Sequence, residues 1–113
     1  MATTSNITSK VIHNLGTTET DLVSVASNQH AACVGLSLCN TTTGVVQASI
    51  MVEDATAVKG YYIKDVEIAP QSSLRVINGG EKLLLSPSTT VSVVSNVASS
   101  IDVIFSLVII TTI

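Results

Sequence analysis

The chain has 113 residues and a formal net charge of −3 at pH 7, with five basic residues scattered along it. This length fits one domain that can bury a hydrophobic core without disulfides or metals. Phosphate binding needs clustered lysine or arginine, so the charge distribution argues against a nucleic-acid-binding protein. Hydrophobic residues make up 46% of the chain and aromatic residues only 3%, so the core must come from Val, Ile, Leu and Ala.

In chain order, the sequence consists of runs rich in Val, Ile and Thr that are separated by Gly, Pro, Asn and Ser. Such runs are typical of β-strands, and no stretch shows the apolar spacing of a capped helix. We therefore predict an all-β protein, with a single antiparallel β-sandwich of the jelly-roll type and about eight or nine strands. The domain is expected to span residues 1–113, with Met1–Asn6 as a flexible N-terminal arm.

The first expected strands are Ser9–Leu15 and Asp21–Ala26, and two longer runs follow them. His30–Cys39 is small or apolar on both faces, as in an interior strand, and Val45–Glu53 is its natural return strand. The turn between them, residues 40–44, contains a glycine at position 44 that can take a positive φ. We predict a hairpin of central strands.

The run Lys59–Ile68 changes its apolar face between Ile63 and Val66. This change predicts a β-bulge or a strand that crosses from one sheet to the other. Pro70 ends the run, because proline has no N–H for the sheet. Asn78-Gly79-Gly80 is a strong turn signal. Short strands are expected around this turn, and their ranges are 73–77, 82–85 and 90–95.

The last segment, Ser100–Ile113, is apolar on both faces. We expect Ile101–Ile109 to be a central strand. Its odd positions form one row that can line a core, namely Ile101, Val103, Phe105, Leu107, Ile109 and Ile113. The second row consists of Ile104, Val108 and Ile110. The segment is too short and too interrupted for a membrane helix, and the N-terminal residues lack the apolar core of a signal peptide.

Residues that could support chemistry are few and dispersed. His13 and His30 are in no dense ligand motif, and the carboxylates at Glu53-Asp54, Asp65 and Glu67 match no calcium loop. We predict no enzyme, no cofactor and no metal. Cys33 and Cys39 would lie about 20 Å apart in an extended strand, too far for a disulfide, so we expect buried free thiols in a reducing cytoplasm.

Tyr61 and Tyr62 are adjacent in a predicted strand and must point to opposite faces. One is expected in the core and the other at a contact surface. An exposed tyrosine on a sandwich also fits a carbohydrate-binding module, which is one alternative function.

The pattern of strands and turns from about Asp21 to Ile113 resembles small virion proteins of tailed bacteriophages, particularly those of marine and cyanobacterial phages. The matching positions are Asn40-Thr41, Tyr62-Ile63-Lys64-Asp65, Pro70, Gly79, Lys82-Leu83 and Ser100-Ile101-Asp102-Val103-Ile104. The chain departs from the pattern in two turns. It has Ser27-Asn28-Gln29 in place of Pro-Ala-Gly, and Pro87-Ser88-Thr89 in place of Ala-Gly-Asp.

The resemblance implies a non-enzymatic structural component of a virion that is assembled in the host cytoplasm. A decoration or cement protein that binds the major capsid protein of the head is the first interpretation, and a neck, tail or fibre-attachment component is the alternative. Because decoration proteins are often trimers, we expect a homo-oligomer, specifically a trimer.

Homo-oligomers also account for the second apolar row, since Ile104, Val108 and Ile110 would be covered by another subunit. The alternative is that the sandwich itself covers this row, for instance with the N-terminal segment Met1–Leu15 folded over it. Tyr61 and Tyr62 are further candidates for a partner surface. No membrane is expected among the partners.

Overall fold

The computed structural model describes residues 3–77 and 82–112, and these ranges fold into strands and turns without a helix. No helix that could cross a membrane is found in them. The strands are β1 Thr3–Leu15, β2 Thr20–Ser24, β3 Gln29–Asn40, β4 Val46–Glu53, β5 Lys59–Ile68, β6 Ser73–Ile77, β7 Leu83–Leu85, β8 Thr90–Ser95 and β9 Ile101–Thr112. The predicted all-β fold is confirmed.

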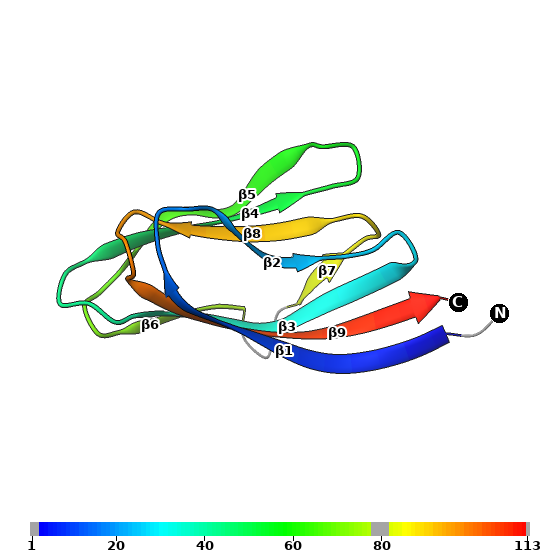
Figure 1. Ribbon diagram of the computed structural model, residues 1–113, viewed down its shortest axis with the longest axis horizontal. Helices are drawn as coiled ribbons and strands as arrows, with labels where there is room; N and C mark the ends of the chain where they lie inside the picture. Colours follow the sequence, from blue (N-terminus) through cyan, green and yellow to red (C-terminus); the bar gives the residue numbers. More distant parts are fainter. Residues whose placement is uncertain (1–2, 78–81, 113) are drawn as a thin grey trace.

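The strands form two antiparallel sheets that pack face to face (Figure 1). One sheet has the order β1-β9-β3-β6, with β7 also paired to β3, and the other has the order β2-β8-β4-β5. The paired strands are nested along the chain, with β1 and β9 outermost and β4 and β5 innermost. This nesting is the strand order of a jelly roll. As predicted, β3, β4 and β9 each lie between other strands.

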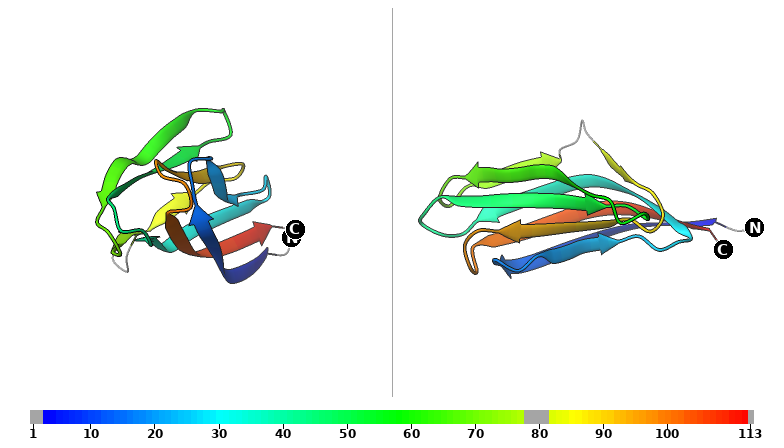
Figure 2. Two further views of the ribbon diagram at one scale, coloured as in Figure 1. Left: turned by 60° about the vertical axis from the view of Figure 1, so that its left-hand side comes forward. Right: turned by 90° about the horizontal axis from the view of Figure 1, so that it is seen from above.

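The sandwich is elongated, with extents of 52 × 27 × 22 Å. Figure 2 shows that the long strands of both sheets run along this axis, and that the start of β1 and the end of β9 lie together at one end of the molecule. This shape gives each sheet a long outer face.

The core between the sheets is built from aliphatic side chains. Ile101, Val103, Phe105 and Leu107 of β9 are at most 3% exposed, which confirms the predicted core row. The facing sheet contributes Val46, Ala48, Ile50, Val91 and Val93. Because side chains alternate along a strand, the same pairing that buries this row directs the second row of β9 to the outer side. Ile109 is only partly buried, and Ile113 is outside the described residues.

β1 begins earlier than the sequence predicts. Thr3–Asn6, expected within a flexible arm, belong to the strand and pair with Ile109–Thr112 of β9. The strand lies beside β9 in the same sheet and does not fold over it, which disagrees with the alternative in which the N-terminal segment covers this row. The N-terminal segment therefore leaves the second apolar row of β9 uncovered.

The predicted irregularity in β5 is a β-bulge. The register with β4 shifts between Ala48 and Ile50, opposite the stretch from Ile63 to Val66. It shifts again between Ile50 and Met51, opposite the stretch from Tyr61 to Ile63. Asp65 has a φ of 49°, and its N–H donates to Ser49 Oγ at 2.9 Å. β5 therefore stays in one sheet and does not cross to the other.

The turn after β3 is held by a buried side chain rather than by glycine. Gly44 does not have a positive φ, contrary to the prediction. Instead the Nδ2 of Asn40 donates towards three carbonyl oxygens, those of Gly44 at 2.8 Å, Ile68 at 3.0 Å and Ala69 at 3.2 Å. Its Oδ1 accepts from the N–H of Thr42 at 2.9 Å. The amide thus joins β3 in one sheet to the end of β5 in the other. The predicted turn at Asn78-Gly79-Gly80 lies outside the described residues.

Candidate interface

Large aliphatic side chains gather on the outer face of the sheet that contains β1, β9 and β3. The most exposed are Ile7 at 83%, Leu84 at 76%, Val11 at 66%, Ile104 at 52% and Ile110 at 46%. We call this surface the outer aliphatic face and define it by Ile7, Val11, Ala32, Leu84, Ile104, Val108 and Ile110. Exposed apolar surface costs roughly 25 cal/mol per Å², and clustered patches of it mark contact sites on soluble proteins.

Strand register brings these residues together from four strands. Ile7 pairs with Val108, Val108 with Ala32, and Ala32 with Leu84, so one apolar row crosses β1, β9, β3 and β7. Val11 pairs with Ile104 in the neighbouring part of the sheet. Residues that are directly opposite in a sheet share a face, so both rows lie on the same face of this sheet. The small residues Ser9, Ser106 and Gly35 lie between the two rows.

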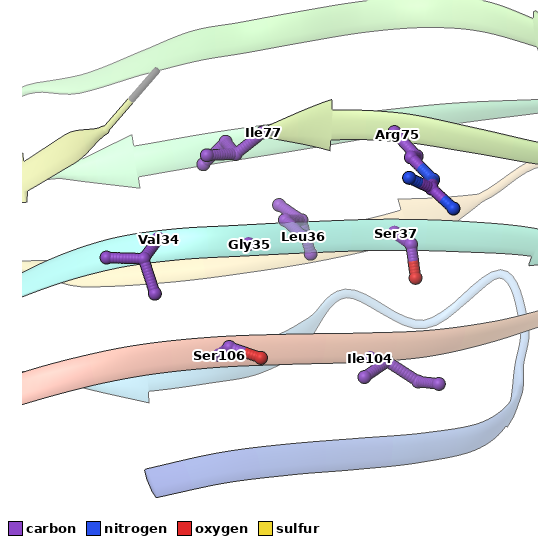
Figure 3. A pocket seen from close by; sticks show the side chains of 8 residues that line it. All are labelled: Val34, Gly35, Leu36, Ser37, Arg75, Ile77, Ile104 and Ser106. Atoms are coloured by element: carbon purple, nitrogen blue, oxygen red, sulfur yellow. The ribbon is translucent and has the colours of Figure 1, made fainter. Parts of the chain in front are cut away.

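A shallow hollow of about 300 Å³ lies next to these rows, across β6, β3 and β9 (Figure 3). Gly35 has no side chain, and its paired residue Ser106 is small, so the surface is depressed between them. Ile104 lines one side of the hollow, and Arg75 lines another. A hollow with apolar and cationic sides can accept a protruding side chain of a partner.

The predicted interface residues of β9 lie on the outer face of the sheet, as a contact with another subunit requires. Ile104 and Ile110 are exposed, and Val108 is partly exposed. The alternative that the sandwich covers this row does not agree with the structure, because β1 lies at the edge of the sheet. The contact with another subunit remains a prediction.

The tyrosine pair has the predicted two-sided arrangement. Tyr61 is exposed on β5, and Tyr62 packs against the core from the other side of the strand. The Lys64 ammonium lies 5.1 Å from the centre of the Tyr61 ring, within the range of a cation–π contact. A sugar ring that stacked on this face of Tyr61 would have to displace the lysine.

The two histidines are in ordinary surface settings. His13 Nδ1 lies 2.8 Å from Asp102 Oδ1, and the same carboxylate oxygen accepts the Asn14 N–H at 3.0 Å. Asn14 has a φ of 58°, so Asp102 stabilises a left-handed residue at the end of β1. His30 is exposed on β3. In residues 3–77 and 82–112, no three His, Cys, Asp or Glu side chains group together as a metal site would require.

The cysteines are free thiols, as predicted. Cys33 is buried, and this burial raises the pKa of its thiol to about 11. Such a thiol is a poor nucleophile at neutral pH, because the thiolate is the reactive form. Cys39 is only partly buried, which differs from the prediction.

Asp54 organises the loop between β4 and β5. Its Oδ1 accepts the Thr56 hydroxyl at 2.7 Å, the Thr56 N–H at 2.9 Å and the Val58 N–H at 3.1 Å. The hydroxyl bond first, and then the two N–H bonds, hold the pKa of Asp54 below its ordinary value. This carboxylate therefore has a structural role in the loop.

Four members of the outer aliphatic face were not predicted as interface residues, namely Ile7, Val11, Ala32 and Leu84. Ile7 and Val11 stand among Thr, Ser, Asn and Lys, so their segment has a polar composition. The available signal was their spacing of four residues, which places both on one face of a strand. Without the register against β9, that spacing alone does not connect them to Ile104 and Val108.

No family model matches the chain, and no curated protein matches it either. Solved structures do resemble it. One comes from work on Bacillus endospore appendages, described as a novel family of disulfide-linked pili; it has a TM-score of 0.59 and 15% identity, over 98% of this chain and 88% of that one.

A second is a mutant VP2 protein of infectious bursal disease virus in derived T=1 particles. It has a TM-score of 0.51 and 10% identity over 95% of this chain. The present chain spans about a third of the VP2 chain, since the match covers 32% of it. At these identities the likeness establishes the fold alone: this chain has a jelly-roll sandwich of a kind found in pilus and viral-particle proteins.

Proposed function

We propose that this chain is a non-enzymatic structural subunit that associates with copies of itself in a repeated assembly. The observation that carries the proposal is the outer aliphatic face, which is long, apolar and on the surface of an isolated subunit. Its location on a regular sheet suits a flat, repeated contact. The fold likeness supports this reading, because the two neighbours are from pili and from viral particles.

Burial of the three side chains of β9 gives a contact energy large enough for such a role. Fully burying a large aliphatic side chain is worth roughly 1.5–3 kcal/mol relative to leaving it fully exposed. Because Ile104 and Ile110 are already about half buried in the subunit and Val108 is partly buried, the three together would contribute about half of the full value, roughly 2–4 kcal/mol per subunit. Ile7, Val11 and Leu84 add to the same face.

We further propose that the assembly is the virion of a tailed bacteriophage, with this chain as a decoration or cement protein on the head lattice. This finer proposal rests on the sequence resemblance. The number of copies per purified virion tests it. Hundreds of copies support a place on the capsid lattice, whereas tens or fewer would favour the neck or tail.

Self-association is tested by the double variant Ile104→Asp with Val108→Asp. We expect it to remain folded and to become monomeric in light scattering, because both side chains point outward. The matched control is Val103→Asp with Leu107→Asp on the same strand, which should unfold, because these side chains line the core. A folded outer-face variant with the same oligomeric state as the wild type would overturn the proposal.

A further inference from the structure

The edge strands of the two sheets differ in their protection against pairing with another chain. Edge strands are commonly short, charged or bulged, because their open backbone groups otherwise bind a second strand. β2, β6 and β7 have five, five and three residues. β5 is longer, but a bulge interrupts it, and it has four charged side chains: Lys59, Lys64, Asp65 and Glu67.

β1 lacks these protections over most of its length. It has 13 residues, and its pairing with β9 runs without a shift from Thr3 to Ile12. Lys10 is the one charged residue in that stretch, which contains no proline. β1 is the last strand of its sheet and forms the lower border of the molecule in Figure 1. The backbone groups on the edge of β1 that faces away from β9 can therefore pair with another strand.

We propose that this strand is β1 of a second copy, paired antiparallel about a two-fold axis with Ser9 opposite its counterpart. The inference rests on the proposed self-association and names a particular contact for it. In this arrangement, the sheets of two subunits join into one continuous sheet. The outer aliphatic face would then extend across both copies.

The exposed aliphatic residues of β1 determine the register. Ile7 and Val11 point to the outer face and lie two positions on either side of Ser9. With Ser9 on the axis, Ile7 of each copy is opposite Val11 of the other, and both aliphatic side chains gain a cross-strand neighbour. A shift of one residue would place the outer face of one copy beside the core-side face of the other. In the chosen register, Lys10 is opposite Thr8 of the other copy, so like charges are not directly paired.

The two apolar rows of the sheet become continuous in this dimer. The row of Leu84, Ala32, Val108 and Ile7 in one copy continues into Val11 and Ile104 of the other. An isolated subunit ends this row at the open edge of β1. The match between the two ends of the rows is the reason to choose a second copy rather than an unrelated strand.

A charge exchange tests the contact. Ile7→Lys alone and Val11→Glu alone should each raise the dissociation constant of the dimer at least about tenfold, since each places an unpaired charge in the contact. Combined in one chain, they should recover most of this loss, because each new lysine is opposite a new glutamate. Val58→Lys is the matched control, as Val58 is 64% exposed in the loop before β5 and Val11 is 66% exposed. Sedimentation equilibrium measures the constants, and circular dichroism checks the fold.

Cysteine cross-linking tests the register independently. Ser9→Cys should give a covalent dimer under mild oxidation, because the two thiols would meet at the axis. Thr3→Cys on the same strand should not, because its two copies would lie twelve strand positions apart, about 40 Å. The wild type, with Cys33 and Cys39, gives the background level.

Recovery by the charge exchange together with cross-linking at Ser9 but not at Thr3 supports the proposal. If the single charge variants stay as associated as Val58→Lys while Ile104→Asp with Val108→Asp becomes monomeric, the β1 contact is wrong and the proposed function stands. If none of these variants alters the oligomeric state, both proposals fail. Cross-linking at Thr3 and not at Ser9 overturns the register and with it the dimer described here.

Discussion

The outer faces of the two sheets differ in the polarity of their side chains. On the sheet of β2, β8, β4 and β5, the outward-facing Ser49 and Ser92 are buried and hydrogen-bonded, to Asp65 and Glu19 respectively. Lys59 Nζ lies 2.6 Å from Glu19 Oε2 above the same face. Among the described residues, Tyr61 is the one large apolar side chain exposed on a strand of this sheet. The other sheet presents the outer aliphatic face instead.

This difference shows that the apolar content of a strand does not by itself identify the core. β4 and β9 are both central strands, and both have one buried aliphatic row. β4 has polar residues between its core residues, apart from Met51, whereas β9 has Ile104, Val108 and Ile110. The outer face of one sheet is therefore mostly polar, and that of the other has exposed aliphatic side chains.

The largest expected effect is on the free energy of unfolding, and it comes from comparing one outward-facing residue of each sheet. Met51 is outward-facing but only 5% exposed, so Met51→Ala should lower the free energy of unfolding by about 2–5 kcal/mol. Leu84→Ala on the outer aliphatic face should change it by no more than about 0.5 kcal/mol in dilute solution, but should weaken self-association. Urea denaturation and sedimentation measure the two quantities. Equal stability losses in the two variants would contradict the comparison.

A smaller effect concerns Asn40, which belongs to neither outer face. Asn40→Ala leaves the buried carbonyl group of Ile68 and the part-buried carbonyl group of Ala69 without this donor, so we expect the free energy of unfolding to fall by about 1–3 kcal/mol. Asn96→Ala is the control, because Asn96 also accepts a backbone N–H, that of Gln47 at 2.9 Å, but is exposed. Urea denaturation of both variants should give the larger loss for Asn40. A loss at Asn96 as large as that at Asn40 would mean that burial does not set the cost.

The sequence was sufficient for the fold and for one side of each strand. Alternation predicted the buried row Ile101 to Leu107. The change of face between Ile63 and Val66 predicted a bulge or a strand that crosses between the sheets, and the structure has the bulge. The sequence did not predict what covers the outward-facing side chains of β9, because that depends on whether the first fifteen residues lie beside β9 or over it. Ile7 and Val108 are about a hundred positions apart, so only the strand register brings them together.

The smallest expected effect comes from the ion pair between Lys59 and Glu19 on the polar outer face. Hydrogen bonds from Lys59 and then Ser92 hold the pKa of Glu19 below its ordinary value, so the contribution of Glu19 to stability is present above an unfolded pKa near 4.5. It is lost as the pH falls through the lower folded pKa. Because both side chains are more than one-third exposed, Glu19→Gln should lower the Tm at pH 7 by only about 1–2 °C.

This difference from the wild type should shrink towards pH 3 and in 1 M NaCl, as expected for a screened ion pair. Glu67→Gln, an exposed carboxylate on β5, is the matched control and should show a smaller shift at pH 7. Thermal unfolding by circular dichroism across this pH range is the measurement. A Tm difference for Glu19→Gln that persisted unchanged at pH 3 would show that packing, not the Lys59 contact, causes it. The contribution of Glu19 to stability would then come from packing rather than charge. The difference between the outer faces of the two sheets would in that case depend on the aliphatic residues alone.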